Sequence, residues 1–173
     1  TKSMKPKQKG DIWCCASSWR PHKRLKENVR YFLEHKKEDD VLIIAGEVSN
    51  SERIKDDSIA YFGNLSQTQL YSLYKASKYF IHLAWLDHCP NVVVDARASG
   101  CHIVCSSAGG TKEIAGTKST IIEEDEWDFK PLNLYDPPQL DFQRKAKNNF
   151  ESCYNIEKVS KTYKDFLEVI TCQ

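Results

Sequence analysis

Two carboxylates eight positions apart, Asp87 and Asp95, flank the start of a predicted helix that begins at Asn91. Pro90 lies near the first position of that helix, where its missing N–H group costs no hydrogen bond. The free amides at the helix start, including those of Asn91 and Val92, favour an anion. Carboxylates that bind hydroxyls around such a helix end suit a sugar joined to a diphosphate. The same two acids would also serve as an ordinary cap that favours the helix dipole.

A basic loop at residues 17–24 lies between a predicted strand at 12–16 and a predicted helix. It places several cations, among them Arg20 and Lys23, where the following helix adds its own partial positive charge. The loop therefore suits a phosphate group. A solvated basic loop without a ligand is the alternative interpretation.

Glycines mark two further strand ends. Gly46 follows an apolar strand and permits close backbone approach to a ligand, although ordinary turns use glycine as often. Gly109 and Gly110 lead into a short predicted helix near Thr111, which is typical of a tight connection or of a backbone contact to a ligand. The sequence lacks GK[ST], GxGxxG and any Asp-x-Asp pair. We therefore expect no metal site.

Short β-rich runs alternate with helical patterns, and this alternation predicts a parallel sheet with helices on both faces. The strands are expected at 12–16, 41–45, 58–62, 79–83, 102–105 and 120–122. Apolar residues at helical spacing predict helices that include 25–33, 70–74 and 91–99. The expected fold class is α/β, a Rossmann-like doubly wound parallel sheet of about six strands. Ligands bind at the carboxyl ends of the strands in such sheets, so the loops described above should share one edge.

The whole chain, 1–173, is expected to form a single Rossmann-like domain. We expect a flexible segment at 1–10 and a loop at 123–140, which is acidic, aromatic and contains three prolines. Helices are expected over 141–173, where apolar residues follow an amphipathic pattern from Ile156 onward.

Composition narrows the class of protein. The 173 residues include 25 Lys+Arg and 24 Asp+Glu, with 40% hydrophobic residues, which is typical of a globular domain. The net charge of +1 argues against a nucleic-acid partner, and no apolar run is long enough to predict a membrane span. Seven cysteines without a framework spacing favour buried thiols in a reducing compartment, so we expect a cytoplasmic protein.

The order of these motifs resembles the C-terminal, donor-binding half of GT-B glycosyltransferases, in particular the retaining family-4 group. Residues 87–95 resemble the E-x7-E motif of that group, with Asp at both ends. Residues 96–104 resemble its EAxAxGxPV segment, with His102 in place of Pro. Residues 109–114 resemble its GG-x-x-E-[IV] turn.

Further stretches extend the resemblance over nearly the whole chain. The loop that ends at Lys23 resembles the R-x4-K phosphate loop, but Ser18 stands where the family has Arg, and Arg20 lies two residues later. Residues 59–65 resemble the v-x-f-x-G-x-[VL] stretch, and residues 150–170 resemble the closing helices. Each motif is loose by itself, whereas the ordered set is specific.

The resemblance implies a metal-independent transfer of a sugar from a nucleotide-diphosphate sugar to an acceptor, with retention of configuration. The residues that it implies for catalysis are Asp87, Lys23 and Arg20. Lys23, with Arg20 as a substitute for the missing Arg, would neutralise the donor diphosphate, and Asp87 would contact hydroxyls of the transferred sugar. Positive charge would stabilise the departing diphosphate as the glycosidic bond breaks.

The resemblance also implies a set of substrate-binding residues. The amides of Asn91 and Val92 would hold the distal phosphate, and Asp95 would accept hydrogen bonds from the ribose hydroxyls. No cofactor is implied, since the nucleotide sugar is itself the substrate.

Beyond the phosphates, Asn64 and Leu65 would border the base, and Gly46 would let the backbone approach the same ligand. The acceptor, a glycan or a lipid-linked molecule, would bind an N-terminal Rossmann domain that this chain lacks. The full-length protein could then associate peripherally with a membrane.

Two other functions remain open at this point. One is a non-catalytic nucleotide-binding or interaction module that keeps half of the GT-B fold, which the two Asp-for-Glu changes and the missing Arg favour slightly. The other is an unrelated doubly wound domain, since a fold alone does not fix a function. Nucleotide binding would exclude the unrelated domain, and turnover by a longer protein would exclude the non-catalytic module.

Overall fold

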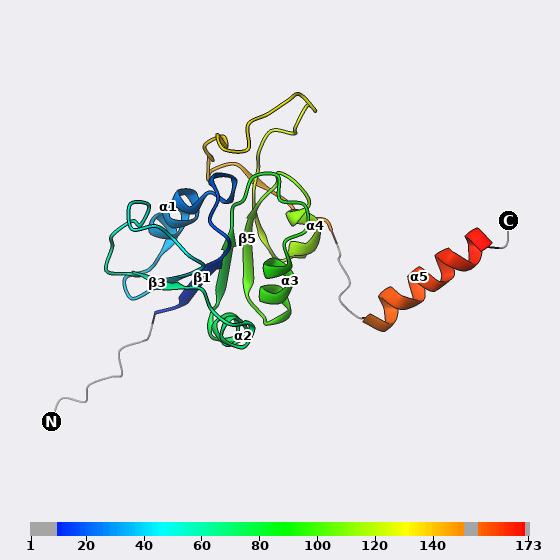
Figure 1. Cartoon of the computed structure of the whole chain (residues 1–173), viewed down its shortest axis with the longest axis horizontal. Helices are drawn as coiled ribbons and strands as arrows, with labels where there is room; N and C mark the ends of the chain where they lie inside the picture. The colour runs from blue at the N-terminus through cyan, green and yellow to red at the C-terminus, as the bar shows by residue number, and fades with distance from the viewer. Residues whose placement is uncertain (1–9, 151–155, 172–173) are drawn as a thin grey trace.

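The computed structural model describes residues 10–150 and 156–171, and this part of the chain confirms the predicted alternation of strands and helices (Figure 1). The strands are β1 (Ile12–Ala16), β2 (Val41–Ala45), β3 (Ile59–Gly63), β4 (Tyr79–His82), β5 (His102–Ser106), β6 (Thr120–Ile122) and β7 (Lys145–Ala146). The helices are the 3-10 turn η1 (Pro21–Lys23), α1 (Leu25–His35), α2 (Gln67–Ala76), α3 (Asn91–Ala98), α4 (Thr111–Ala115) and α5 (Ile156–Thr171).

The strands form one sheet in the order β3-β2-β1-β4-β5-β6-β7. Every neighbouring pair from β3 to β6 is parallel. The sheet grows from β1 to β3 on one side and from β4 to β6 on the other. The boundary between β1 and β4 is therefore the switch point of a doubly wound sheet, which is where such sheets bind ligands.

Two apolar layers enclose the sheet, because neighbouring side chains of a strand point to opposite faces. Cys15 lies in the layer that α1 covers with Val29 and Phe32, whereas Cys14 lies in the layer under α2, α3 and α4. Helices on both faces were predicted, and Figure 1 shows α1 on one side of the sheet and α3 on the other. Four of the five cysteines in the described part of the chain are buried free thiols, as expected.

The predicted strands are all present. β1, β2 and β6 have the predicted bounds, while β3 is shifted by one residue, β4 is one residue shorter and β5 is one residue longer than predicted. The helices predicted to include 25–33, 70–74 and 91–99 are present too. Gly100 follows the end of α3 and has a φ of +97°, in the left-handed region that favours glycine.

The expectation of helices from residue 141 onward is wrong for residues 141–150, which are not helical. Leu140 and Phe142 both enter the apolar layer under α1, and a spacing of two belongs to extended chain. The chain then forms β7, a seventh strand that pairs antiparallel with β6. A strand of two residues has no periodicity for a sequence pattern to show.

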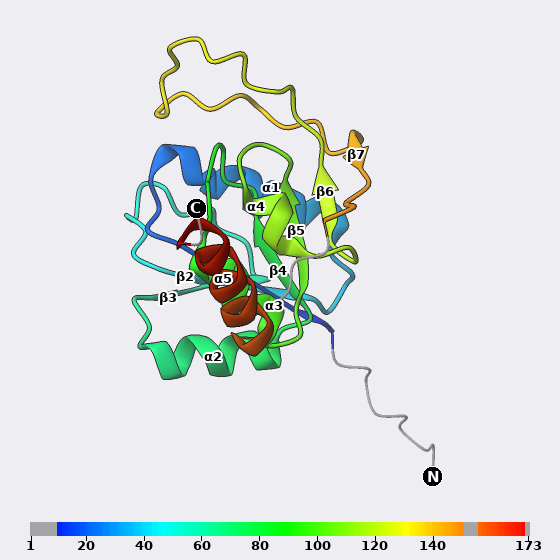
Figure 2. The same cartoon turned by 90° about the vertical axis from the view of Figure 1, so that its right-hand side faces the viewer.

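The remaining expectations concern the ends of the chain and the long loop. Residues 1–9 lie outside the described residues, as do 151–155 and 172–173. The loop over residues 123–140 is confirmed, and Figures 1 and 2 show it, in yellow, above the sheet edge at which β6 ends. α5 follows the amphipathic pattern that begins at Ile156. Within the described residues, no helix has the length and apolar character that crossing a membrane requires.

Candidate functional site

Lys23 and Asp87 form an ion pair at the switch point of the sheet. The Nζ atom of Lys23 lies 2.5 Å from Oδ2 of Asp87, and 17% and 15% of the two side chains are exposed. Lys23 ends η1 in the loop after β1, and Asp87 belongs to the loop after β4. The structure thus brings together, from distant parts of the sequence, the cation expected at the diphosphate and the carboxylate expected at the sugar.

A histidine completes this cluster. His82, the last residue of β4, is 4% exposed and places Nε2 2.8 Å from the same Oδ2 of Asp87. Burial alone would raise the pKa of Asp87, but the hydrogen bonds from His82 and Lys23 outweigh burial and hold the pKa well below its usual range. Burial lowers the pKa of His82 itself. The cluster therefore contains an anionic Asp87 and a neutral His82 at neutral pH.

Backbone contacts join the loops around the cluster into one rim. The loop after β4 meets the loop after β1 where the amide of Trp85 donates to the carbonyl of His22 at 2.7 Å. It meets the loop after β5 where the amide of Gly110 donates to the carbonyl of Asp87 at 2.9 Å. A Cβ on Gly110 would lie 2.1 Å from the carbonyl oxygen of His88, so this approach requires glycine.

Asn28 of α1 also connects two loops of this rim by hydrogen bonds. Its side chain is buried, donates to the carbonyl of Lys23 at 3.0 Å and accepts from the amide of Leu83 at 3.1 Å. One amide group thus bridges the loops after β1 and β4. A buried polar residue inside an amphipathic helix signals such a contact, but the sequence does not show its partners.

The start of α3 supplies free amides four residues beyond Asp87. Pro90, at the N-cap position, makes no side-chain capping hydrogen bond, and the amide of Val93 bonds back to the carbonyl of Pro90 at 3.0 Å. The amides of Asn91 and Val92 are therefore the groups left at the helix end, as the sequence predicts. Asp95 lies half-buried in the second turn of the helix. Its role at a ribose stays a prediction.

Arg20 lies on the same loop as Lys23 but is exposed to solvent. It lines a cavity of about 440 Å³ together with Trp19 and Tyr135, between the loop after β1 and the loop over residues 123–140. The pKa of the neighbouring His22 is lowered, chiefly by burial and further by the charges of Lys23 and Arg20. The structure therefore places Arg20 on the loop of Lys23 and on the wall of a separate cavity.

Gly46, Asn64 and Leu65 follow β2 and β3, on the same edge of the sheet as Lys23. Gly46 has a φ of +100°, and a Cβ there would lie 1.9 Å from the carbonyl oxygen of Ser17. This glycine is therefore required for packing against the loop after β1, with or without a ligand. Asn64 is exposed and Leu65 is half-buried. Their contact with a base stays a prediction.

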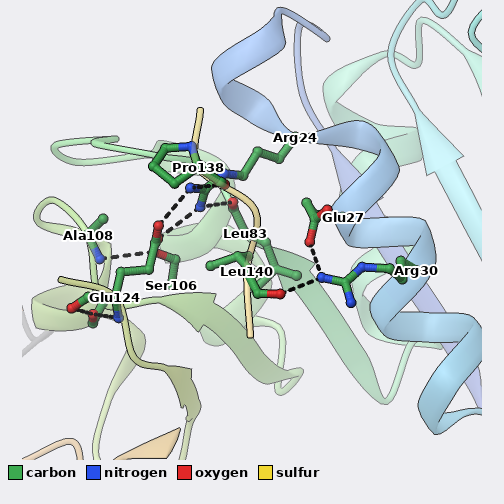
Figure 3. A network of polar contacts seen from close by, with 10 residues as sticks. Arg24, Glu27, Arg30, Leu83, Ser106, Ala108, Glu124, Pro138 and Leu140 are labelled. Carbon is green, nitrogen blue, oxygen red and sulfur yellow. Dashed lines mark hydrogen bonds and ion pairs between the residues drawn. The ribbon is translucent and has the colours of Figure 1, made fainter. Parts of the chain in front are cut away.

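Arg24 and Glu124 form a buried network beside the cluster (Figure 3). The guanidinium of Arg24 donates to both carboxylate oxygens of Glu124 and to the carbonyl of Pro138 at 2.7 Å. Ser106 at the end of β5 also donates to Glu124. Sequence reasoning placed Arg24 only among the loop cations and gave Glu124 no role, because no local pattern links residues 100 positions apart.

Among the described residues, no group of three or more His, Cys, Asp or Glu side chains is arranged to hold a metal ion. The polar groups at the rim are instead suited to organic hydroxyls and phosphates, which they would bind by charge and hydrogen bonds.

Comparison with solved structures finds the same fold in glycosyltransferases. Anabaena Alr3699/HepE in complex with UDP-glucose has 16% sequence identity and a TM-score of 0.57, and the match covers 68% of this chain and 36% of HepE. WaaG, a glycosyltransferase involved in lipopolysaccharide biosynthesis, has 16% identity and a TM-score of 0.54, with 68% and 35% of the two chains covered. The catalytic domain of Arabidopsis thaliana starch synthase IV, bound to ADP and acarbose, has 13% identity and a TM-score of 0.55, with 70% and 29% covered.

The chain thus spans about a third of the length of these proteins, and its sheet corresponds to one half of a GT-B fold. No curated protein sequence matches it significantly. The sequence profile of the Glycosyl transferases group 1 family matches residues 2–128, which is more than half of the chain. The protein therefore belongs to the Glycosyl transferases group 1 family and contains a glycosyltransferase domain of that family.

Proposed function

We propose that this chain is the donor-binding domain of a glycosyltransferase that transfers a sugar from a nucleotide-diphosphate sugar to an acceptor, without a metal ion and with retention of configuration. The observation that carries the proposal is the ion pair of Lys23 and Asp87 at the switch point, four residues before the uncapped start of α3. Family membership supports the reaction class. The UDP-glucose bound to HepE supports a nucleotide sugar as donor.

The positive groups of the site bind the diphosphate of such a donor, and the negative Asp87 binds its sugar. Lys23, assisted by Arg20, meets the diphosphate, and the amides of Asn91 and Val92 hold its distal phosphate. Asp87 is anionic and accepts hydrogen bonds from hydroxyls of the transferred sugar. As the glycosidic bond breaks, negative charge grows on the leaving diphosphate, where Lys23 and the dipole of α3 stabilise it.

The nucleoside lies farther along the same edge. Asp95 accepts from the ribose hydroxyls, and Asn64 and Leu65 border the base beside Gly46. The acceptor, a glycan or a lipid-linked molecule, binds a second Rossmann domain on the other side of the donor.

Calorimetric titration of the chain with UDP, GDP and ADP in the presence of EDTA tests the proposal, with the bare nucleosides as controls. We expect at least one nucleoside diphosphate to bind more tightly than its nucleoside. Binding that requires added magnesium or manganese would overturn the metal-free mechanism. Absence of binding under both conditions would overturn the donor-binding function itself.

A further inference from the structure

His82 is a buried residue next to Asp87, the residue proposed to bind the sugar. The proposed function leaves His82 without a role. It is 4% exposed at the end of β4, and its ring lies parallel to that of Phe80, with ring centroids 6.3 Å apart and planes 11° apart. The contact with Phe80 and the hydrogen bond to Asp87 fix the ring in one orientation. An imidazole fixed in this way can hold a carboxylate in one place.

The hydrogen between His82 and Asp87 belongs to the histidine. The neutral imidazole has one N–H group, and an ionised carboxylate can only accept. Since Nε2 lies 2.8 Å from Asp87 Oδ2, Nε2 carries the hydrogen and donates it. The proposed function places no substrate on His82, so its contact with the chemistry runs through Asp87.

The two protein donors of Asp87 meet on one oxygen. Both Lys23 Nζ and His82 Nε2 bond to Oδ2, and within the described part of the chain no donor bonds to Oδ1. Oδ1 is therefore the atom that a hydroxyl from outside the protein can reach. The carboxylate is held from one side and open on the other.

A bound donor would change this balance. Its diphosphate carries more negative charge than Asp87, so it would draw the ammonium group of Lys23 away from the carboxylate. Asp87, whose side chain is 15% exposed, would then lose its cation. Burial favours the protonated carboxyl, and a protonated or rotated Asp87 would accept sugar hydroxyls poorly. The hydrogen bond from His82 does not depend on the phosphates and would remain in place.

We propose that His82 is a positioning residue that keeps Asp87 ionised and directs Oδ1 to a hydroxyl of the transferred sugar after Lys23 has moved to the diphosphate. The inference rests on the proposed function, because it takes Asp87 as the sugar ligand. It predicts that His82 contributes to recognition of the sugar and not to recognition of the nucleoside diphosphate.

The experiment measures the ratio of two affinities, that for a nucleotide sugar and that for its nucleoside diphosphate. UDP-glucose with UDP, GDP-mannose with GDP and ADP-glucose with ADP are titrated into the wild-type chain to find the pair that shows a sugar contribution. The variants are His82→Leu, which removes the donor, and His82→Gln, whose amide reaches the place of Nε2. His102→Leu is the control, since His102 is a half-buried histidine at the opposite end of the sheet that bonds Thr120.

We expect His82→Leu to lower the affinity ratio about tenfold or more, the effect of losing one hydrogen bond to a charged group, with little change for the diphosphate alone. His82→Gln should restore the ratio, and His102→Leu should leave it unchanged. A wild-type ratio near one, or a ratio that His82→Leu preserves, would overturn the role of His82 while diphosphate binding stands. If His82→Leu fails to fold, His82→Asn replaces it, because the shorter amide cannot reach Asp87, and equal ratios for Asn and Gln would overturn the inference. If the wild-type chain binds none of these nucleotides, the proposed function itself is refuted.

Discussion

Arg24 and Glu124 are 100 residues apart in the sequence and form a buried, bidentate ion pair with N–O distances of 2.9 and 2.6 Å. Arg24 directly follows Lys23 and has a φ of +50°, in the left-handed region, which costs a residue with a Cβ roughly 1–2 kcal/mol. The buried side chain contacts of Arg24 hold the backbone in this conformation. The pair therefore fixes the loop of Lys23 to the loop after β6.

Glu124→Gln should reduce the free energy of unfolding by about 3–5 kcal/mol, because it leaves the buried Arg24 guanidinium without its counter-charge. Urea unfolding of the full chain measures this difference. Glu34→Gln is the matched control, since Glu34 pairs with Arg30 at 3.3 Å on the helix surface and its loss should cost at most about 0.5 kcal/mol. Equal effects of the two substitutions would show that the Arg24–Glu124 pair stabilises the fold no more than a surface ion pair does.

Gly110→Ala should displace the loop of Asp87, because the new Cβ would lie 2.1 Å from the carbonyl oxygen of His88. Crowding of this kind costs about 1–3 kcal/mol, and we also expect weaker binding of a nucleotide sugar. Gly100→Ala is the control. Apart from its chain neighbours, no atom of the described residues lies within 4 Å of a Cβ at Gly100, and only its left-handed backbone is strained. A thermal melt first measures the stability of each variant. Calorimetric titration of the folded variants should then find weakened nucleotide-sugar binding in Gly110→Ala alone. A Gly110→Ala chain with intact binding would contradict the close packing of the two loops.

Stability should fall as the pH decreases from 7.5 to 5.5, and His82 should contribute to this loss. Burial holds the pKa of His82 below its ordinary value in the folded state. The unfolded chain therefore takes up a proton near pH 6.5 that the folded chain does not, and protons favour unfolding. Urea unfolding of the wild type and of His82→Gln at several pH values tests this. His22 and His102, whose pKa values are also lowered, titrate in both proteins and cancel in the difference. Parallel pH profiles would contradict a neutral, buried His82.

Sequence patterns predicted most of the fold because each central strand is a short apolar run that two layers bury. The run from Val41 to Ala45 is an example, and β2 has the predicted bounds. β7 could not be predicted in this way, since its two residues owe their conformation to pairing with β6. The end of β4 differed by one residue because the apolar run continues to the buried Leu83, beyond the last ladder pair at His82.

The site was predictable to the extent that it follows from chain order. Lys23 and Asp87 each follow a strand next to the switch point, so the topology alone brings their loops together. The bonds of His82, Arg24 and Glu124 depend on side-chain directions across the sheet. A histidine inside a buried strand signals a required hydrogen bond partner, but only the folded structure shows that the partner is Asp87.

Lys23→Ala and Asp95→Asn should weaken nucleotide binding in different ways. Lys23 acts on phosphates, so its loss should weaken binding of the diphosphate about tenfold or more and spare the bare nucleoside. Asp95 acts on the ribose, so its loss should weaken both ligands. Lys26→Ala is the control, because Lys26 is an exposed cation three residues beyond Lys23. Equal losses of nucleoside affinity in the Lys23 and Asp95 variants, measured by calorimetry, would show that the roles are assigned wrongly.

The chain by itself should bind a donor but transfer no sugar. Transfer requires the acceptor hydroxyl at near-attack distance from the anomeric carbon, and such orientation supplies roughly 7–11 kcal/mol of the barrier. The described residues form one sheet, and the proposed function uses the carboxyl edge of that sheet for the donor. A donor on this edge stays open to water, which weakens the electrostatic stabilisation of the leaving diphosphate.

The test compares transfer from UDP-, GDP- and ADP-sugars by this chain with transfer by a longer form that carries a second Rossmann domain. Turnover by the longer form alone would exclude a non-catalytic module. Robust transfer by the 173-residue chain would show instead that one Rossmann domain suffices to hold both substrates.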